Sequence, residues 1–431
     1  MRRYLKPLVV SLTIALGAIP ATRAASAPGV ESQFLQAARD LDLDALTSLA
    51  GNASRGDIAS ASRGVLMALH GEDAAAIRTL TAVASSKQAS ADVRFEVLQT
   101  LASVYHRGAK FVKSAQALKA SLALRVGTPE DVASTEAALV NDALLAEAAP
   151  MSAMVSPSAD VHITRNPLEL PTAAVHIDEE VVQAVLDTGA ANSVVSQSMA
   201  KRLKLRMLGD TKGSARRGDH RLAARFAVAD SLDFAGGKFR NVPFIVLDDA
   251  ALEIETDSGK HSLNAIIGLP VLRQLGRLEF RNGSDGETLH RTSGGAGAKR
   301  PGNLLLVESM PVVLVRIEGG ATPMRMALDT GANRSVLTPL ATSERPELLS
   351  QSTVRESKSA GAGGTVVDSA TRVIRSLSLD VGGSHVALKD VYVAEPLARC
   401  HGVLGQDVLR SGAGYAIDFE SMNVELLRAG G

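Results

Sequence analysis

The stretch that decides the fold occurs twice in this chain of 431 residues. Residues 175–196 have the sequence VHIDEEVVQAVLDTGAANSVVS, and residues 315–338 have the sequence VRIEGGATPMRMALDTGANRSVLT. Each copy places Asp-Thr-Gly-Ala, beginning at Asp187 or Asp329, directly after an apolar segment with the alternation of a β-strand. The two copies predict a duplicated unit with one carboxylate at the end of a strand in each half.

The likeness continues along the chain in the same order. A paired-glycine turn follows at Gly236–Gly237 in the first copy and at Gly382–Gly383 in the second. Two aliphatic residues and a glycine come next, ending at Gly268 and at Gly405. Short apolar runs separated by Gly, Asp and Asn clusters are typical of β-strands joined by turns. The shared order therefore indicates duplication of an all-β unit.

These motifs resemble those of the aspartic proteases, specifically the retropepsin-like domains. The resemblance rests on LDTGA at residues 186–190, on LDTGA at residues 328–332 and on the two later glycine segments, and it covers residues 160–428. One Asp-Thr-Gly tripeptide also makes ordinary turns, but two copies in equivalent contexts are far more specific. The resemblance implies two all-β acid-protease barrels and two catalytic carboxylates, Asp187 and Asp329.

The resemblance also gives supporting roles to residues around the carboxylates: Thr188, Gly189, Thr330, Gly331, Gly268 and Gly405. The threonine hydroxyls are expected to hydrogen-bond the backbone of the opposite loop and hold the carboxylates coplanar. The glycines that follow the threonines are expected to let the chain turn sharply. The two later glycines are expected to pass close beneath the Asp loops, where a side chain would clash. Each carboxylate is expected to be exposed to a cleft.

The paired carboxylates imply general acid–base attack by water on a peptide carbonyl, with no covalent intermediate, metal or other cofactor. Two close carboxylates cannot both ionise easily, so one proton is shared between them. Pepsin-like relatives usually carry a Ser or Thr after Asp-Thr-Gly, whose hydroxyl favours the charged carboxylate. Ala190 and Ala332 stand at these positions here. Their presence predicts a less acidic pH optimum.

Substrate is expected to be held over the carboxylates by β-hairpin flaps, as the resemblance implies. The candidate flap of the first copy is Ser214–Leu222, around Gly218, and that of the second copy is Ser359–Val366, around Gly363. The first is basic and the second is almost uncharged, which suggests different subsites on the two sides. The alternative is that both segments are solvated loops, and the substrate-binding residues stay unknown.

Residues 28–150 are predicted to be helical. Phe34, Ala38 and Leu41 recur at the spacing of one helix face, and Thr128 before Pro129 is a typical helix start. Residues 71–77 and 108–115 form a weak repeat that resembles a tetratricopeptide-type helix pair. The helical domain is interpreted as a surface for a protein partner, with a helical pro-segment or a packing domain as the alternatives.

Residues 1–27 have the layout of a secretory signal peptide: a basic start, an apolar run over residues 8–19 and small residues at the end. Cleavage is expected near Ala24 or Ala27. The mature protein is then expected to be periplasmic or secreted, with no integral membrane segment. An uncleaved N-terminal anchor is the alternative.

The composition excludes several other classes of protein. Basic and acidic residues balance at 46 each, which argues against a nucleic-acid binder. The single cysteine, Cys400, allows no internal disulfide, and His401 beside it would point to the opposite face of a strand, so a thiol-protease pair is not expected. The histidines show no spacing typical of a metal site.

The predicted fold class is multidomain α + β. A helical-hairpin domain is followed by two retropepsin-like barrels, at residues 160–282 and 303–428. Mixed polar and Gly-rich or Pro-rich composition predicts linkers at residues 146–160 and 283–302. The predicted function is that of an exported aspartic endopeptidase acting on peptide or protein substrates. The alternative is a non-catalytic peptide-binding or scaffold protein that uses helical repeats and inactive barrels.

Overall fold

The computed structural model of the chain describes residues 8–10, 29–52, 56–211, 216–217, 220–221, 223–256, 259–283, 286–293, 302–318, 320, 322–361, 364–397 and 399–428. The expected cleavage sites near Ala24 and Ala27 lie outside the described residues. Leu8–Val10, expected within the signal peptide, form strand β1. Among the helices in the described ranges, none has the length and apolar character needed to span a membrane.

The N-terminal region is helical, as the sequence predicts, and its elements are α1 (Val30–Asp40), α2 (Leu43–Gly51), α3 (Asp57–Leu69), α4 (Asp73–Ser85), α5 (Ala91–Arg107), α6 (Phe111–Ala123) and α7 (Pro129–Leu145). The predicted helix start at Thr128 is confirmed. Its hydroxyl accepts a hydrogen bond from the Asp131 N–H (3.1 Å), and the Asp131 carboxylate accepts one from the Thr128 N–H (2.8 Å). Phe34 and Ala38 are buried, because they share the inward face of α1.

The first β region, residues 152–292, contains β2 (Ser152–Val155), β3 (Ser158–Arg165), β4 (Pro171–Ile177), β5 (Glu180–Leu186), β6 (Ser193–Ser196), α8 (Gln197–Arg202), β7 (Arg206–Asp210), β8 (Arg216–Arg217), β9 (His220–Arg221), β10 (Ala224–Phe234), β11 (Gly237–Leu247), η2 (Asp249–Leu252), β12 (Glu253–Thr256), β13 (Gly259–Ser262), β14 (Ala265–Ile267), α9 (Leu269–Leu272), η3 (Arg273–Leu275), β15 (Arg277–Gly283) and β16 (Gly286–Thr292). This region is called the first half below.

The second half, residues 304–427, contains β17 (Leu304–Val307), β18 (Met310–Ile317), β19 (Met324–Leu328), β20 (Val336–Leu337), α10 (Pro339–Glu344), η4 (Pro346–Gln351), β21 (Ser352–Gly361), β22 (Gly364–Val381), β23 (Ser384–Val393), β24 (Gly402–Leu404), α11 (Gln406–Leu409), β25 (Gly414–Asp418) and β26 (Asn423–Leu427). On the edge of this half, β1 pairs in parallel with Lys358–Ala360 of β21.

The two halves have the same strand topology, as expected from their duplicated sequences. In the first half the pairings run β4–β5–β14–β6–β11–β10, and β10 pairs back onto β4. In the second half they run β18–β19–β24–β20–β23–β22, and β22 pairs back onto β18. Both sheets therefore close into barrel-like β regions, and alternate side chains of each strand fill the interior.

The halves are joined by a shared sheet. β15 of the first half pairs antiparallel with β25 of the second, with Leu278 opposite Ile417. These two residues occupy equivalent positions in the repeated sequence. Next to them the rings of Phe280 and Tyr415 stack with centroids 4.6 Å apart. Pairing between equivalent positions relates the two halves by a pseudo-two-fold axis.

The two predicted linkers are wrong in part, because both contain strands. Residues 146–160 include β2 and the start of β3, and residues 283–302 include β16. β2 pairs on β11, while β16 lies between β15 and β3. These short strands have turn-rich neighbours in the sequence, so their formation depends on tertiary pairing that no local pattern reveals.

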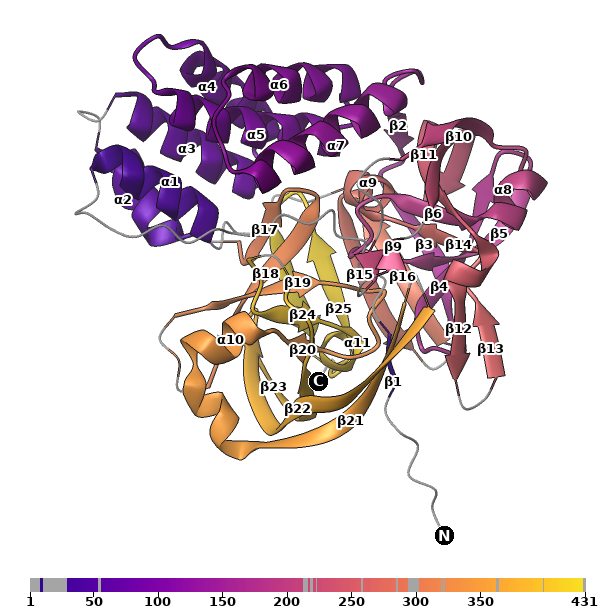
Figure 1. Cartoon of the computed structure of the whole chain (residues 1–431). Coiled ribbons are helices and arrows are strands. Elements are labelled where there is room, and N and C mark those ends of the chain that lie inside the picture. Colours follow the sequence, from indigo (N-terminus) through magenta and orange to yellow (C-terminus); the bar gives the residue numbers. More distant parts are fainter. Residues whose placement is uncertain are drawn as a thin grey trace.

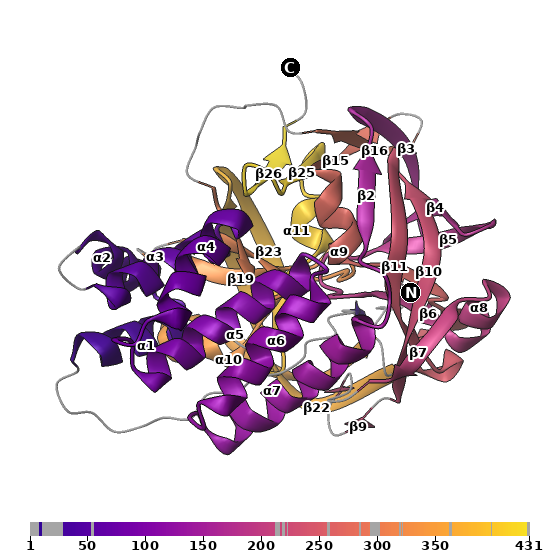
Figure 2. The same ribbon diagram turned by 90° about the horizontal axis from the view of Figure 1, so that it is seen from above.

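Helices α1 to α7 lie together on one side of the two β regions (Figure 1). Seen from above, α5, α6 and α7 extend across the molecule towards the first half, while α1 and α3 lie over the second (Figure 2). Apolar residues of α3 and α5, such as Leu69 and Leu98, share a continuous core with β17 and β18 of the second half. The helical domain is therefore packed against the β regions.

Candidate active site

The two aspartates are delivered by equivalent strands. Asp187 directly follows β5, and Asp329 directly follows β19. β14 runs parallel to β5 and β24 runs parallel to β19. The Asp187 N–H donates to the Ile267 carbonyl oxygen (3.0 Å), and the Asp329 N–H donates to that of Leu404 (3.1 Å). Each loop is thus fixed at its start by the neighbouring parallel strand.

The two loops are tied to each other by their threonines. The Thr188 hydroxyl donates to the Leu328 carbonyl oxygen (2.8 Å), and the Thr330 hydroxyl donates to the Leu186 carbonyl oxygen (2.7 Å). In return, each hydroxyl accepts from the backbone N–H of the opposite threonine, at 2.9 Å and 3.1 Å. These reciprocal bonds are the arrangement that the family resemblance implies. All are buried, so they fix the separation of the two loops.

The carboxyl groups of Asp187 and Asp329 meet between the loops. Oδ1 of Asp187 accepts hydrogen bonds from the N–H groups of Gly189 (2.8 Å) and Ala190 (3.1 Å). Its carboxyl group lies against Gly331 of the other loop, and that of Asp329 lies against Gly189. Both aspartates are 0% exposed. The expectation that each carboxylate is exposed to a cleft is therefore wrong for this conformation.

The glycines after the threonines are needed for space. A Cβ atom built on Gly331 would lie 2.4 Å from Cγ of Asp187, and one on Gly189 would lie 2.6 Å from Cγ of Asp329. Neither glycine has a positive φ, whereas ten other glycines of the described residues do. Both glycines lie in turns, as the sequence predicts, but these turns do not need a left-handed backbone. A side chain at either position would occupy the place of the opposite carboxyl group.

The two later glycines allow a close approach to the Asp loops. A Cβ atom on Gly268 would lie 2.6 Å from the backbone of Asn192, and one on Gly405 would lie 2.7 Å from the backbone of Arg334. Both contacted residues follow the Asp-Thr-Gly motif of the same half. A backbone atom cannot give way as the end of a side chain can. The structure places these glycines where the sequence analysis expects them.

Two serines near the site were not found by sequence reasoning. The Ser193 hydroxyl accepts from the Gly268 N–H (3.1 Å), and the Ser335 hydroxyl accepts from the Gly405 N–H (2.9 Å). Each serine lies six residues after its aspartate in both copies, so the repeat carried a signal. In the second half the Ser335 hydroxyl donates onward to Asp407 (2.6 Å). These bonds hold the glycine segment against the Asp loop.

The electrostatics of the pair favour a shared proton. Burial, the charge of Asp329 and a hydrogen bond with the Asp329 carboxyl group together raise the pKa of Asp187 well above the usual range of an aspartate. The N–H groups of Gly189 and Ala190 act in the opposite direction and do not outweigh these effects. Such a pair titrates as a unit, so its two apparent pKa values belong to the dyad. One carboxyl group can then act as an acid while the other acts as a base.

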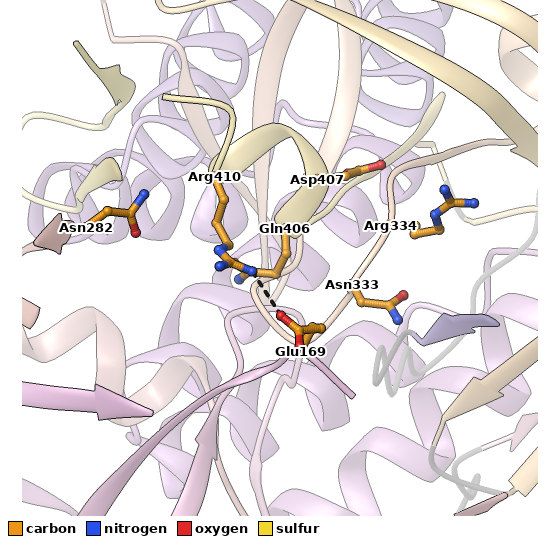
Figure 3. A pocket seen from close by; sticks show the side chains of 7 residues that line it. All are labelled: Glu169, Asn282, Asn333, Arg334, Gln406, Asp407 and Arg410. Carbon is orange, nitrogen blue, oxygen red and sulfur yellow. Dashed lines mark hydrogen bonds and ion pairs between the residues drawn. The ribbon is translucent and has the colours of Figure 1, made fainter. Parts of the chain in front are cut away.

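A polar cavity of about 430 Å³ lies between the halves, next to the loop that carries Asp329 (Figure 3). Asn333 and Arg334 of that loop line it, with Arg410 directly after α11 and Glu169 of the first half. Glu169 and Arg410 face each other and form an ion pair of 3.3 Å. This cavity adjoins the dyad loop and is lined by both halves.

The two candidate flaps correspond to hairpins. β8 and β9 form the first, with Arg216 opposite Arg221, and β21 and β22 form the second, with Gly361 opposite Gly364. The named residues Gly218 and Gly363 lie outside the described residues. The second hairpin is long, because β22 extends from residue 364 to residue 381. The structure therefore has a hairpin at each candidate position.

Other chemistries find no support in the described part of the chain. Cys400 is 0% exposed, and burial raises the pKa of its thiol to about 12, so the thiol stays protonated and unreactive. His401 instead contacts Glu344 (2.9 Å). No three His, Cys, Asp or Glu side chains of the described residues are grouped closely enough to hold a metal ion.

Comparisons with known proteins agree with the duplicated site. The family model described as "gag-polyprotein putative aspartyl protease" matches two tandem regions, residues 173–274 and 313–411. Each region contains one Asp-Thr-Gly motif and one of the later glycines. No curated protein matches the chain.

Two solved structures are similar to parts of the chain. A retropepsin-like aspartic protease from Rickettsia conorii is 17% identical, with a TM-score of 0.21, over 34% of this chain and 96% of that one. The retroviral protease-like domain of Ddi1 from Leishmania major is 21% identical, with a TM-score of 0.17, over 25% of this chain and 77% of that one. The matches of the family model, one to each β region, identify two tandem retropepsin-like aspartic protease domains within the chain.

Proposed function

We propose that this protein is an aspartic endopeptidase in which one chain supplies both catalytic carboxylates. The observation that carries the proposal is the meeting of Asp187 and Asp329 from two equivalent loops in a buried site. Burial and the neighbouring carboxyl group both raise the pKa of Asp187, whereas a carboxylate in a structural ion pair has a lowered pKa. A perturbed pair of this kind is typical of acid–base chemistry.

The reaction follows from one proton shared by two carboxyl groups. The ionised carboxylate takes a proton from water, whose oxygen attacks the carbonyl carbon of the peptide bond. The protonated carboxyl group gives its proton to the carbonyl oxygen, which forms a tetrahedral diol. Transfer of a proton to the leaving nitrogen then breaks the C–N bond. Because Asp187 and Asp329 are buried here, the groups that cover them must move before a substrate can reach them.

The alternative, a scaffold or peptide-binding protein with inactive barrels, is less consistent with the dyad. Burying two carboxyl groups against each other costs folding free energy. Either one group stays protonated at neutral pH, or two negative charges repel each other. A protein that only binds peptides would lose nothing by replacing either aspartate with asparagine. Both aspartates, both threonines and both neighbouring glycines are present in this chain. Retention of the costly pair favours catalysis.

The first test is a peptide-library digest in which the variants Asp187→Asn and Asp329→Asn are assayed singly and mixed. If each chain builds its own dyad, every site in the mixture contains one asparagine, and the mixture stays inactive. Pairing of β15 with β25 within one chain supports this expectation. Recovery of activity on mixing would show that the dyad forms between chains. Absence of peptide cleavage by the wild-type protein would reject the proposed function.

Activity is expected to extend to less acidic pH than the ordinary pKa of a carboxyl group, about 4. The active dyad carries one proton, and the raised pKa of Asp187 keeps that proton bound as the pH rises past 4. The same shift makes the stability of the fold decrease as the pH rises from the pKa of Asp187 in the unfolded chain to its higher pKa in the folded protein. The reason is that the folded state binds the proton more tightly. A pH–rate profile checks this. An alkaline limb at or below pH 4 would contradict it.

A further inference from the structure

An ion-pair junction joins the helical domain to both halves. Asp73, the first residue of α4, accepts a hydrogen bond from Arg107 of α5 (2.5 Å) and another from Arg273 of the first half (2.6 Å). The Arg107 guanidinium also donates to the Leu306 carbonyl oxygen in β17 of the second half (3.3 Å). Two side chains of the helical domain thus bond directly to residues of both halves. Asp73, Arg107 and Arg273 are called the junction below.

The junction is largely shielded from water. The side chains of Asp73, Arg107 and Arg273 are 24%, 4% and 18% exposed. Burial alone would raise the pKa of Asp73, but the two guanidinium groups outweigh it and lower this pKa. Charge-assisted hydrogen bonds between shielded groups are stronger than exposed ion pairs, and loss of one partner leaves a buried charge uncompensated. These contacts can therefore resist separation of the three parts.

The junction lies next to the loop that carries Asp187. The side chains of Arg107 and Arg273 line one narrow crevice with Ala191 and Leu269. Ala191 belongs to the Asp187 loop, and the Leu269 N–H donates to the carbonyl oxygen of the preceding loop residue, Ala190 (2.9 Å). A shift of Arg273 relative to the helices would therefore act on segments that hold the catalytic loop.

Apolar packing connects the helical domain to both Asp loops in the same way. Ala190, in the loop of the first half, shares a buried core with Phe111 and Leu145 of the helical domain. Ala332, the equivalent residue of the second half, shares a core with Leu98 and other residues of the helices. The buried core around each loop therefore extends into the helical domain, which lies across the two β regions (Figure 2).

We propose that the helical domain is a clamp that holds the two halves at the separation at which Asp187 and Asp329 share a proton. This inference rests on the proposed function. Asp73, Arg107 and Arg273 are positioning residues in it, because they act on the dyad through the loops and not on the substrate. A displacement of about 1 Å at reacting groups can lower the rate on the order of 10²-fold, so a clamp that prevents such a displacement has a large effect on the rate.

The proposal is tested in the full-length protein with Arg273→Met. This variant removes the ion pair between Asp73 and the first half and leaves the ion pair of Arg107 with Asp73 intact, so no buried cation loses its carboxylate. Arg273→Lys keeps the charge and is the conservative variant. The matched control is Asp142→Asn, which breaks a shielded pair with His106 (2.6 Å) that lies wholly within the helical domain. All variants are compared below their unfolding temperatures.

We expect Arg273→Met to lower kcat by about 10-fold to 10²-fold with little change in KM. Its two pH–rate limbs should move towards each other, because carboxyl groups held farther apart influence each other's titration less. Arg273→Lys should recover most of both effects, and Asp142→Asn should show neither. A kcat and pH profile for Arg273→Met like those of the control would overturn the proposal.

Hydrogen exchange provides a readout that needs no catalysis. The N–H groups of Thr188 and Thr330 donate across the two loops, so separation of the halves would expose both to exchange. Faster exchange at these two amides in Arg273→Met, but not in Asp142→Asn, supports the clamp even if the wild-type protein cleaves no peptide. Unchanged exchange rejects it. If the Met variant is unfolded by circular dichroism, Arg273→Gln is put through the same measurements and judged by the same outcomes.

Discussion

Replacement of Asp187 or Asp329 by Asn is expected to lower kcat/KM for peptide cleavage by at least about 10²–10⁴-fold. Asparagine cannot exchange a proton, so the dyad loses either its acid or its base. The double variant should be no slower than either single variant, because both residues act as one unit. Cleavage is measured on the best peptide from the library digest. Wild-type rates in either variant would show that the two aspartates are not the catalytic pair.

The folding of these variants is expected to be intact, which separates chemistry from stability. The raised pKa of Asp187 means that its ionised form is disfavoured in the folded state, so the native pair destabilises the fold at neutral pH. Asparagine has a similar shape and carries no charge. The melting temperature at neutral pH should therefore be equal to or above that of the wild type. A large decrease would assign the carboxyl groups a structural role.

The duplicated halves could be predicted because the decisive signals are local and occur twice. Asp187 and Asp329 each follow an apolar strand and precede a glycine, and a second glycine segment follows in both copies. The pairing of β10 with β4 in the first half is repeated by the pairing of β22 with β18 in the second. Equivalent sequences fold to equivalent topology, so the position of the site between two loops could also be expected.

The contacts around the site depend on residues that are distant in the sequence. Gly331 is needed because Asp187 of the other half occupies its free space, which no inspection of one loop can show. Asp73, Arg107 and Arg273 come from three separate segments, and no sequence pattern shows that they meet. Charged side chains are usually solvated, so a shielded junction follows only from the tertiary structure.

The steric role of Gly331 leads to a second prediction of large effect. Gly331→Ala is expected to abolish the proposed peptide cleavage, although both carboxyl groups of the dyad remain. The new Cβ would lie 2.4 Å from Cγ of Asp187 and 2.5 Å from its Oδ2. The Asp187 carboxyl group cannot yield easily, because Gly189 and Ala190 bind its Oδ1. The carboxyl group or the whole loop must therefore move, and a shift of about 1 Å predicts a loss of about 10²-fold or more in kcat.

The matched control for this steric argument is Gly51→Ala, since Gly51 has an ordinary backbone conformation and a Cβ there would meet nothing within 4 Å. That variant should keep wild-type kcat. In Gly331→Ala the displaced carboxyl groups should also titrate more independently, so the loss of rate should come with a narrower pH–rate profile. If Gly331 were needed only for its backbone conformation, Gly331→Ala would lower the stability of the fold without changing the pH–rate profile. Wild-type kcat in Gly331→Ala would mean that Asp187 does not lie against the opposite loop in the conformation that cleaves peptides.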